Sequence, residues 1–330
     1  GASSGLGRAY AESLAARGFD LLVVARRGER LRELAEAAGA AHGVNVRPVP
    51  AVLAHDEGIA ACRDALDGGP APDLAILNAG FGSHGPLWTL DRAREADMVR
   101  LNCVAVVDLA VHVLPAMVAR GSGALVIVSS AAAWQPVPFM ATYAATKAFE
   151  LHLAEALSEE LRGGRVRALA VCPGPTRTEF GAAAGSQVAH TYVPFDDTAL
   201  VVRATWRALA AGRRRAPTGT VARASMLAAR LLPRGLVVRG GAPSPRPCRP
   251  PGAPGAPPAV TTTLIPTLSA IIAALVVLAT TPLAARLARA VGAVDQPSDR
   301  RIHREPTPRL GGLAILAGFL VPVLYFLPAD

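Results

Sequence analysis

Short apolar runs in the first 240 residues end in small or polar residues, which is the pattern of a parallel sheet. The clearest runs cover 21–25, 74–77 and 125–128, and a further short run precedes 171–178. We expect each to be a strand buried on both faces. Segments with helical spacing separate these runs. The pattern predicts a doubly wound α/β domain with a Rossmann-like parallel sheet over residues 1–240.

The first helical segment follows a glycine-rich turn, Gly1-Ala-Ser-Ser-Gly5-Leu-Gly7. Backbone amides at such a turn hold a pyrophosphate well, although a plain tight turn is the alternative. A doubly wound sheet places its first strand centrally, and here that strand is expected to be missing. Each lost core side chain costs about 2 to 5 kcal/mol, so the total defect exceeds ordinary stability. We therefore expect the chain to be a fragment of a longer gene product.

Residues 241–330 follow a different pattern. Proline and glycine dominate 241–262, which predicts an extended linker. Two uncharged stretches follow, at 264–282 and 310–329, and each is long enough to cross a hydrocarbon core of about 30 Å. We expect both to be transmembrane helices of a partial membrane module over 263–330, with membrane lipid as its partner. A buried helix of a soluble domain is the alternative.

An amphipathic pattern over 222–238 predicts a helix just before the linker. Its apolar face either covers a substrate pocket or touches lipid. The segment 180–194 is rich in alanine and glycine and predicts a flexible lid over that pocket. Together the apolar lid and helix favour an apolar substrate.

Basic charge is concentrated in the C-terminal part of the chain. Residues 201–330 hold 17 Lys+Arg against 4 Asp+Glu, whereas residues 1–200 hold 17 against 21. No RNA-binding aromatic pattern or zinc-ligand spacing accompanies the basic excess, so we expect no nucleic-acid partner and no metal site. The arginines fit the cytoplasmic flanks of membrane helices.

The chain contains a single lysine, Lys147, four residues after Tyr143, while the other 33 basic residues are arginine. On a helix this spacing puts the ammonium beside the phenol, where its charge favours the phenolate. A tyrosine so placed can act as a general acid or base. The alternative is an exposed pair on an ordinary amphipathic helix. Ser130 decides between them, because it ends the apolar run at 125–128, where a hydroxyl faces the ligand crevice.

The order of these parts resembles the short-chain dehydrogenase/reductase family over residues 1–240. The shared motifs are the glycine-rich turn, Asn78-Ala-Gly80, an asparagine at 102, Ser130, Tyr143-x-x-x-Lys147 and Pro173-Gly174-x-x-x-Thr178. The resemblance implies a catalytic set of Asn102, Ser130, Tyr143 and Lys147. Tyr143 would be the general acid, Lys147 would lower its pKa and bind the nicotinamide ribose, Ser130 would hold the substrate oxygen, and Asn102 would anchor a relay water.

The resemblance also implies a set of cofactor-binding residues, comprising Tyr143 and Lys147 together with Gly1, Ser4, Gly5, Leu6, Gly7, Arg26, Asn78, Ala79, Gly80, Pro173, Gly174, Thr176 and Thr178. Arg26 and Arg27 end the second strand, where an NAD enzyme would carry an acidic residue, so we expect NADP (NADPH) as the cofactor. The alternative is that both arginines only solvate the next helix. Val52-Leu53 departs from the family's Asp-Leu beneath the adenine.

The loop between the two apolar C-terminal stretches resembles a second family, the polyprenyl-phosphate N-acetylhexosamine-1-phosphate transferases. The motifs are Asp295-x-Pro297, Arg300-Arg301-x-His303, Pro306-x-Pro308-Arg309 and Gly311-Gly312. The aspartates that such enzymes carry in later loops do not occur in this sequence. We therefore expect a positive-inside anchor without transferase chemistry.

The expected function is an NADP-dependent oxidoreductase that moves hydride between NADPH and a carbonyl or alcohol, on a domain that self-associates in the family manner. The alternative is a fragment of a membrane glycosyl-1-phosphate transferase fused to an inactive reductase. A third possibility is a cofactor-binding domain without catalysis. One membrane crossing would place the reductase outside, away from NADPH, so we favour two reading frames run together. The reductase domain is expected in the cytoplasm, and the whole chain at the membrane if the fusion is real.

Overall fold

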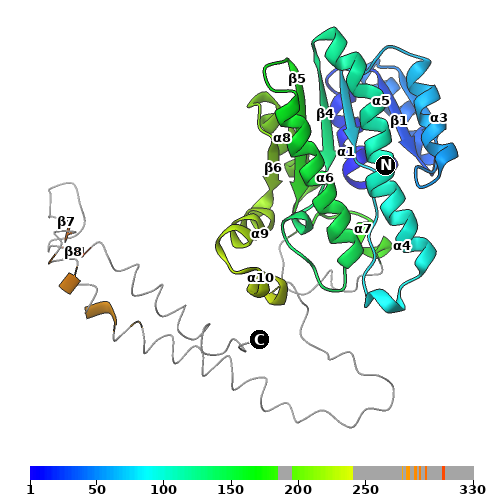
Figure 1. Ribbon diagram of the computed structural model, residues 1–330. Coiled ribbons are helices and arrows are strands. Elements are labelled where there is room, and N and C mark those ends of the chain that lie inside the picture. The colour runs from blue at the N-terminus through cyan, green and yellow to red at the C-terminus, as the bar shows by residue number, and fades with distance from the viewer. Residues whose placement is uncertain are drawn as a thin grey trace. The chain divides into compact units, whose positions relative to one another are not determined.

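The computed structural model describes residues 1–184 and 195–240, together with residues 277, 280–282, 286–287, 290, 294–295 and 307–308. The chain divides into two compact units, Gly1–Arg246 and Pro247–Asp330. The first unit is an α/β domain in which helices cover both faces of parallel strands (Figure 1). It confirms the α/β, Rossmann-like fold expected from the apolar runs.

Six parallel strands form two separate sheets in the first unit. β1 (Leu21–Ala25) pairs with β2 (Val46–Pro50). A four-stranded sheet has the order β3-β4-β5-β6, comprising β3 (Leu74–Leu77), β4 (Gly123–Val128), β5 (Val166–Pro173) and β6 (Arg215–Thr218). Register places Leu125 of β4 beside Ala75 of β3 and Ala168 of β5.

Helices alternate with the strands along the chain. Their bounds are α1 (Gly5–Ala15), α2 (Gly28–His42), α3 (Asp56–Asp67), α4 (Arg92–Val99), α5 (Ala105–Arg120), α6 (Ala141–Glu160), α7 (Phe180–Ala183), α8 (Thr198–Ala210), α9 (Gly219–Leu231) and α10 (Arg234–Gly240). Shorter turns are η1 (Leu87–Thr89), the π-helical η2 (Arg100–Val104) and η3 (Ala131–Trp134).

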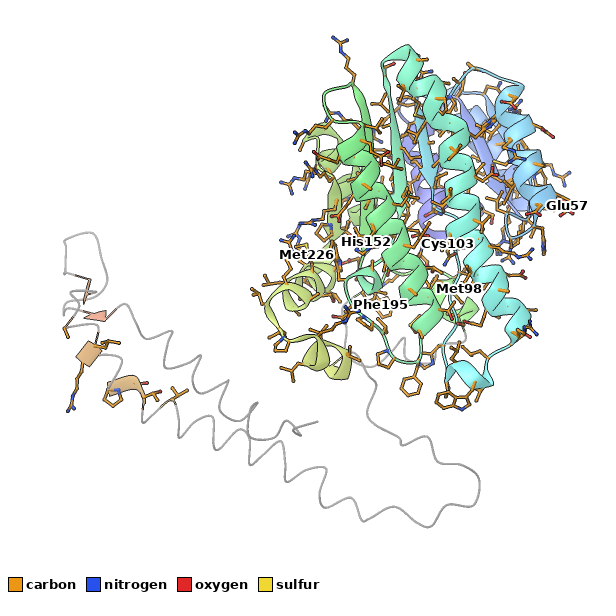
Figure 2. All side chains as sticks on the ribbon, viewed as in Figure 1. Glu57, Met98, Cys103, His152, Phe195 and Met226 are labelled. Carbon is orange, nitrogen blue, oxygen red and sulfur yellow. The ribbon has the colours of Figure 1, made fainter. Side chains whose placement is uncertain are left out.

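Alternation along β4 builds two cores, because successive strand side chains point to opposite faces. Leu125 and Ile127 pack with residues of α5 and α6 on one face. Val126 and Val128 pack with Tyr10 of α1 and with α8 on the other. All four side chains are buried, in a region where side chains from helices and strands lie between the ribbons (Figure 2). A strand buried on both faces explains its uniformly apolar sequence.

The expected gap in the sheet is present between β1 and β3. Within the described residues no strand joins these two, and a cavity of about 730 Å³ lies between them, lined by Leu22, Val24, Leu74, Ile76, Leu109 and Val113 among others. Gly1 and Ala2 border the cavity, and the Ala2 amide donates to the Val24 carbonyl over 3.1 Å. The glycine turn therefore starts beside the gap.

The helix predicted over 222–238 is two helices. α9 ends at Leu231 and α10 begins at Arg234. Pro233 lies between them, and Leu232 before it is extended, with φ −97° and ψ 148°. Proline has no amide hydrogen and disfavours a helical residue before it, so the continuous apolar pattern is interrupted there.

Described residues of the second unit are few. β7 (Val294–Asp295) and β8 (Thr307–Pro308) form an antiparallel pair. The predicted linker, the second apolar stretch, His303 and nearly all of the first apolar stretch lie outside the described residues. Within the part that is described, the helix running from Arg92 to Arg120 is the one long and apolar enough to cross a membrane, with 29 residues and a mean hydropathy of 1.9. Its α5 portion packs in the core of the first unit.

Candidate functional site

The predicted catalytic residues meet at the carboxyl end of β4. Tyr143 and Lys147 lie on α6 and are buried, with 7% and 4% of their surfaces exposed. The Lys147 ammonium lies 5.8 Å from the centre of the Tyr143 ring. Ser130 follows β4 as the N-cap of η3, and its hydroxyl lies near enough to Tyr143 to lower the pKa of the phenol. The alternative of an exposed pair on a surface helix is therefore wrong.

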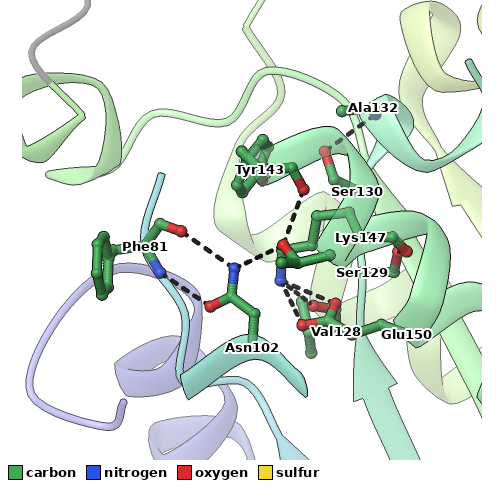
Figure 3. A network of polar contacts seen from close by, with 10 residues as sticks. Phe81, Asn102, Val128, Ser129, Ser130, Ala132, Tyr143, Lys147 and Glu150 are labelled. Atoms are coloured by element: carbon green, nitrogen blue, oxygen red, sulfur yellow. Dashed lines mark hydrogen bonds and ion pairs between the residues drawn. The ribbon is translucent and has the colours of Figure 1, made fainter. Parts of the chain in front are cut away.

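α6 is held against β4 by polar contacts beside the catalytic pair (Figure 3). Ser129 donates its hydroxyl to the Lys147 carbonyl over 2.7 Å, and the Lys147 ammonium donates to the Val128 carbonyl over 3.0 Å. These bonds join the end of β4 to the first turns of α6. They orient Tyr143 and Lys147 relative to Ser130.

Asn102 is fully buried within the π-helical turn η2. Its amide nitrogen donates to the Phe81 carbonyl over 3.1 Å and to the Thr146 hydroxyl over 3.0 Å, and its oxygen accepts from the Phe81 amide over 3.4 Å (Figure 3). The side chain therefore ties the segment after β3 to α6. A π-turn of this kind is frequent at functional sites.

The glycine turn packs closely against the segment after β3. The Asn78 amide donates to the Gly1 carbonyl over 3.5 Å, and Gly1 lies beside Ala79. A Cβ on Gly7 would overlap the Gly1 carbonyl oxygen. A Cβ on Gly80 would lie 3.1 Å from the Asn102 amide oxygen and 3.2 Å from the Lys147 ammonium. A side chain at Gly7 would displace backbone, and one at Gly80 would crowd Asn102 and Lys147, so the predicted turn and Asn78-Ala-Gly80 lie close to the predicted catalytic residues.

The N-terminus of α1 fits an anionic cofactor. Ser4 is the N-cap, but its side chain makes no capping hydrogen bond. The first amides of a helix have no partner inside the helix, and its dipole favours an anion there. Leu6 instead packs its side chain against the core, so only its backbone is available at this turn. The arrangement suits a pyrophosphate.

Two neighbouring arginines, Arg26 and Arg27, follow β1. Arg27 contacts the glycine turn. Its guanidinium donates to the Ser4 hydroxyl over 2.7 Å and to the Ser3 hydroxyl over 3.2 Å. It also pairs with Glu179 over 2.8 Å, as does Arg30 over 2.7 Å. Hydrogen bonds from Arg30 and Arg27 lower the pKa of Glu179 to about 2. Arg26 and Arg27 are both exposed, and Arg27 is the one whose guanidinium contacts the serines of the turn.

The segment after β5 lies beside the glycine turn. Pro173 ends β5, and the Thr176 hydroxyl donates to the Gly174 carbonyl over 2.9 Å. A Cβ on Gly5 would lie 3.1 Å from the Thr178 side chain. These residues were predicted as cofactor-binding, and the structure brings Thr178 to the turn.

Phe180, the first residue of the predicted lid, lies with its ring 5.2 Å from that of Tyr143. Lid residues 185–194 lie outside the described residues.

Burial sets the protonation of Tyr143, the predicted general acid. It raises the pKa of Tyr143, against the Lys147 charge and the Ser130 hydrogen bond, which both lower it. The phenol therefore holds its proton at neutral pH and can donate it. Burial acts to lower the pKa of Lys147, but the nearby Glu150 and Tyr143 outweigh it and raise that pKa. The ammonium stays charged.

Sequence reasoning missed Glu150 and Glu179. Glu150 pairs with Lys147 over 2.9 Å and is 1% exposed. Its signal was present, since it lies three residues after Lys147 on the same helix. Glu179 pairs with arginines about 150 residues earlier in the chain, and no local pattern could have found that contact.

Comparison with known proteins agrees with the geometry. The family model described as short chain dehydrogenase matches residues 1–189. A very-long-chain 3-oxoacyl-CoA reductase of Pyricularia oryzae is 35% identical over 173 residues, which are 50% of this chain and 51% of that protein. The chain thus spans about half the length of this relative. A 7beta-hydroxysteroid dehydrogenase of Clostridium sardiniense is 33% identical over 182 residues, covering 54% of this chain and 68% of that protein.

Among solved structures, a short-chain dehydrogenase from Sphingobium yanoikuyae in complex with NADPH is similar, with a TM-score of 0.63 and 34% identity. The match covers 69% of this chain and 89% of that one. The family match and the residues gathered at the end of β4 point the same way, and the chain belongs to the short-chain dehydrogenase family.

Proposed function

We propose that residues 1–240 form an NADP-dependent oxidoreductase that transfers hydride between NADPH and a carbonyl or alcohol. The observation that carries this proposal is the arrangement of Ser130, Tyr143 and Lys147. A hydroxyl, a protonated phenol and a buried ammonium meet at the carboxyl end of a central strand. Ligands bind at this edge of a doubly wound sheet.

In the reducing direction, Tyr143 donates its proton to the substrate oxygen, and Ser130 hydrogen-bonds the same oxygen. The glycine turn would hold a nicotinamide dinucleotide, which would supply the hydride when bound. Lys147 stabilises the phenolate that remains and reaches the ribose hydroxyls. Asn102 holds the segment after β3 in place through Phe81 and is proposed to anchor a relay water.

NADPH is proposed over NADH because Arg27 offers a positive charge beside the serine hydroxyls of the turn. A guanidinium suits a phosphate, whereas a 2′-hydroxyl is usually met by a carboxylate. The related structure from Sphingobium yanoikuyae contains NADPH, which supports the proposal.

An apolar substrate is proposed on two grounds. Phe180 lies against Tyr143, and one relative is named for a very-long-chain acyl substrate and another for a steroid.

The reductase domain is proposed to work in the cytoplasm as a homo-oligomer. A membrane module over 263–330, held by lipid and similar to the start of a glycosyl-1-phosphate transferase, remains a proposal, as does the alternative of an inactive reductase fused to it.

Replacing Tyr143 with Phe tests the proposed function. Turnover of ketones, followed by NADPH absorbance, should fall by about 100-fold or more because the proton donor is lost. NADPH affinity, measured by fluorescence titration, should stay within about three-fold, since a single hydroxyl contributes little to binding of the whole dinucleotide. Equal turnover by the variant and the parent would overturn the proposal, and absence of turnover in both would favour the inactive alternative.

A further inference from the structure

Glu150 is a buried carboxylate in contact with the catalytic lysine. Both of its oxygens lie 2.9 Å from the Lys147 ammonium, which also donates to the Val128 carbonyl over 3.0 Å (Figure 3). The side chains of Lys147 and Glu150 are 6% and 2% exposed. Two protein groups, the Val128 carbonyl and the Glu150 carboxylate, therefore accept the hydrogen bonds that the ammonium donates among the described residues.

Such a pair has two opposing effects on the lysine. A buried ammonium without a counter-ion loses its proton readily, because burial disfavours the charged form. The carboxylate prevents that loss. At the same time the negative charge offsets the ammonium's field at the phenol, and the presence of Glu150 raises the pKa of Tyr143. Glu150 thus keeps Lys147 charged while weakening its action on Tyr143.

We infer that Glu150 is a positioning residue that holds the Lys147 ammonium at the Val128 carbonyl, keeps it charged in the interior, and frees it to act on Tyr143 when Glu150 takes up a proton. Nothing in the roles assigned to Ser130, Tyr143 and Asn102 requires this carboxylate. The inference rests on the proposed function only for its effect on turnover, because the pair itself can be observed without a reaction.

The titratable side chains packed around Glu150 are two cysteines, Tyr143 and Lys147. Among them Glu150 is the group with a pKa near neutral pH. Burial raises its pKa to about 7, in spite of the ammonium. Cys103 of η2 (Figure 2) and Cys172 of β5 also face the cluster, and burial raises the pKa of these thiols to about 11 and about 12. Tyr143 and Lys147, on the same helix, both have raised pKa values. A change near pH 7 in this cluster therefore belongs to Glu150.

The single lysine of the chain makes the inference directly testable. The full chain labelled with 13Cε-lysine should give one lysine signal in proton–carbon correlation spectra. Its shift should show a step near pH 7, reporting Glu150, and the ammonium itself should titrate only in the alkaline range. In E150Q the step should vanish, and the proton affinity of the lysine should fall about ten-fold or more, because the counter-ion is gone.

Glu155 provides a matched control on the same helix, where it pairs with Arg215 over 2.6 Å. E155Q removes a partly buried ion pair of similar kind, and its lysine signal should follow the parent. H152Q excludes the exposed His152 as the source of the step. If E150Q fails to fold by circular dichroism, E150D retains the charge at a shorter reach and should shift the step while lowering the lysine midpoint.

A lysine titration in E150Q that is identical to the parent overturns the inference. That result is independent of the proposed function, since no substrate is present. Conversely, loss of the step in E150Q supports the inference even if Y143F shows that the chain has no reductase activity. If the inference and the proposed reductase function are both correct, E150Q should also displace the pH profile of turnover relative to E155Q.

Discussion

Arg27 contacts the serines of the glycine turn, whereas the sequence offered both Arg26 and Arg27 for the cofactor phosphate and Arg26 was the one predicted as a binding residue. The guanidinium of Arg27 donates hydrogen bonds to the hydroxyls of Ser3 and Ser4 and forms an ion pair with Glu179. A cofactor phosphate would compete with that carboxylate for the same donors. Successive side chains at a strand end point to opposite sides, and this alternation decides which of two adjacent arginines faces the turn. Residue type cannot decide it, because both residues are arginine.

Arg27→Ala should raise the KM for NADPH by about 10- to 100-fold, since a charge-assisted hydrogen bond contributes about 1.5–3 kcal/mol. The KM for NADH should change little. Initial rates with both cofactors measure this, and Arg26→Ala is the matched control, expected within about three-fold of the parent. A larger effect from R26A than from R27A would restore the sequence-based choice.

Glu150 also predicts a pH dependence of stability. Burial raises its pKa in the folded protein from 4.5 to about 7, so the folded state binds this proton more tightly than the unfolded state. The corresponding stabilisation is complete below about pH 4.5 and is lost as the pH rises through about 7. E150Q should lack this component. Thermal melts at pH 5 and pH 8 should show a smaller decline for E150Q than for E155Q, and equal declines would contradict the assignment.

At the scale of elements, Gly7 of α1 and Gly39 of α2 differ in the space available for an added methyl group. A Cβ on Gly7 of α1 would overlap the Gly1 carbonyl oxygen and lie 2.7 Å from the Asn78 amide nitrogen. A Cβ on Gly39 of α2 would meet only the Val44 carbonyl oxygen, at 3.5 Å. Gly7 is therefore required by packing of the turn, whereas Gly39 is an ordinary helical glycine.

Gly7→Ala should lower the free energy of unfolding by about 2 kcal/mol or more, because backbone atoms cannot move aside cheaply. Gly39→Ala should raise it by about 0.5 to 1 kcal/mol through helix propensity. Urea denaturation measures both. Stabilisation by G7A would show that the turn is looser than the contacts of Gly1 and Asn78 indicate.

At the scale of the whole first unit, the sheet is divided. β1 and β3 face each other across a cavity of about 730 Å³, and within the described residues neither strand has a strand partner on that side. A gap of this kind weakens the centre of the domain, where a doubly wound sheet is ordinarily most stable.

Extending the chain at Gly1 by five apolar, β-branched residues should stabilise it on the order of 5 kcal/mol, since a new strand would bury apolar side chains and pair both edges. Thermal melts and hydrogen exchange of β1 and β3 amides measure the effect. A glycine-serine extension of equal length is the control, and equal stability of the two would show that the cavity does not accept a strand.

Local patterns in the sequence were sufficient for much of the fold and for the core of the site. Apolar runs located β1, β3 and β4 within two residues of their observed bounds, because burial on both faces leaves a plain signature. Tyr143 and Lys147 share a helical face by spacing alone, and glycines mark the turn. Pro233 divided a helix whose apolar pattern is continuous, since a missing amide outweighs periodicity there.

The tertiary structure alone decided the contacts between distant segments. It brought Ser130 near Tyr143 and Thr178 beside the glycine turn, and it paired Glu179 with Arg27 and Arg30. It also buried Glu150 against Lys147, turning a helical neighbour into a counter-ion. Sequence determines helix and strand through spacing along one segment, whereas charges and protonation depend on which segments exclude water from one another, and only the folded chain brings those segments together.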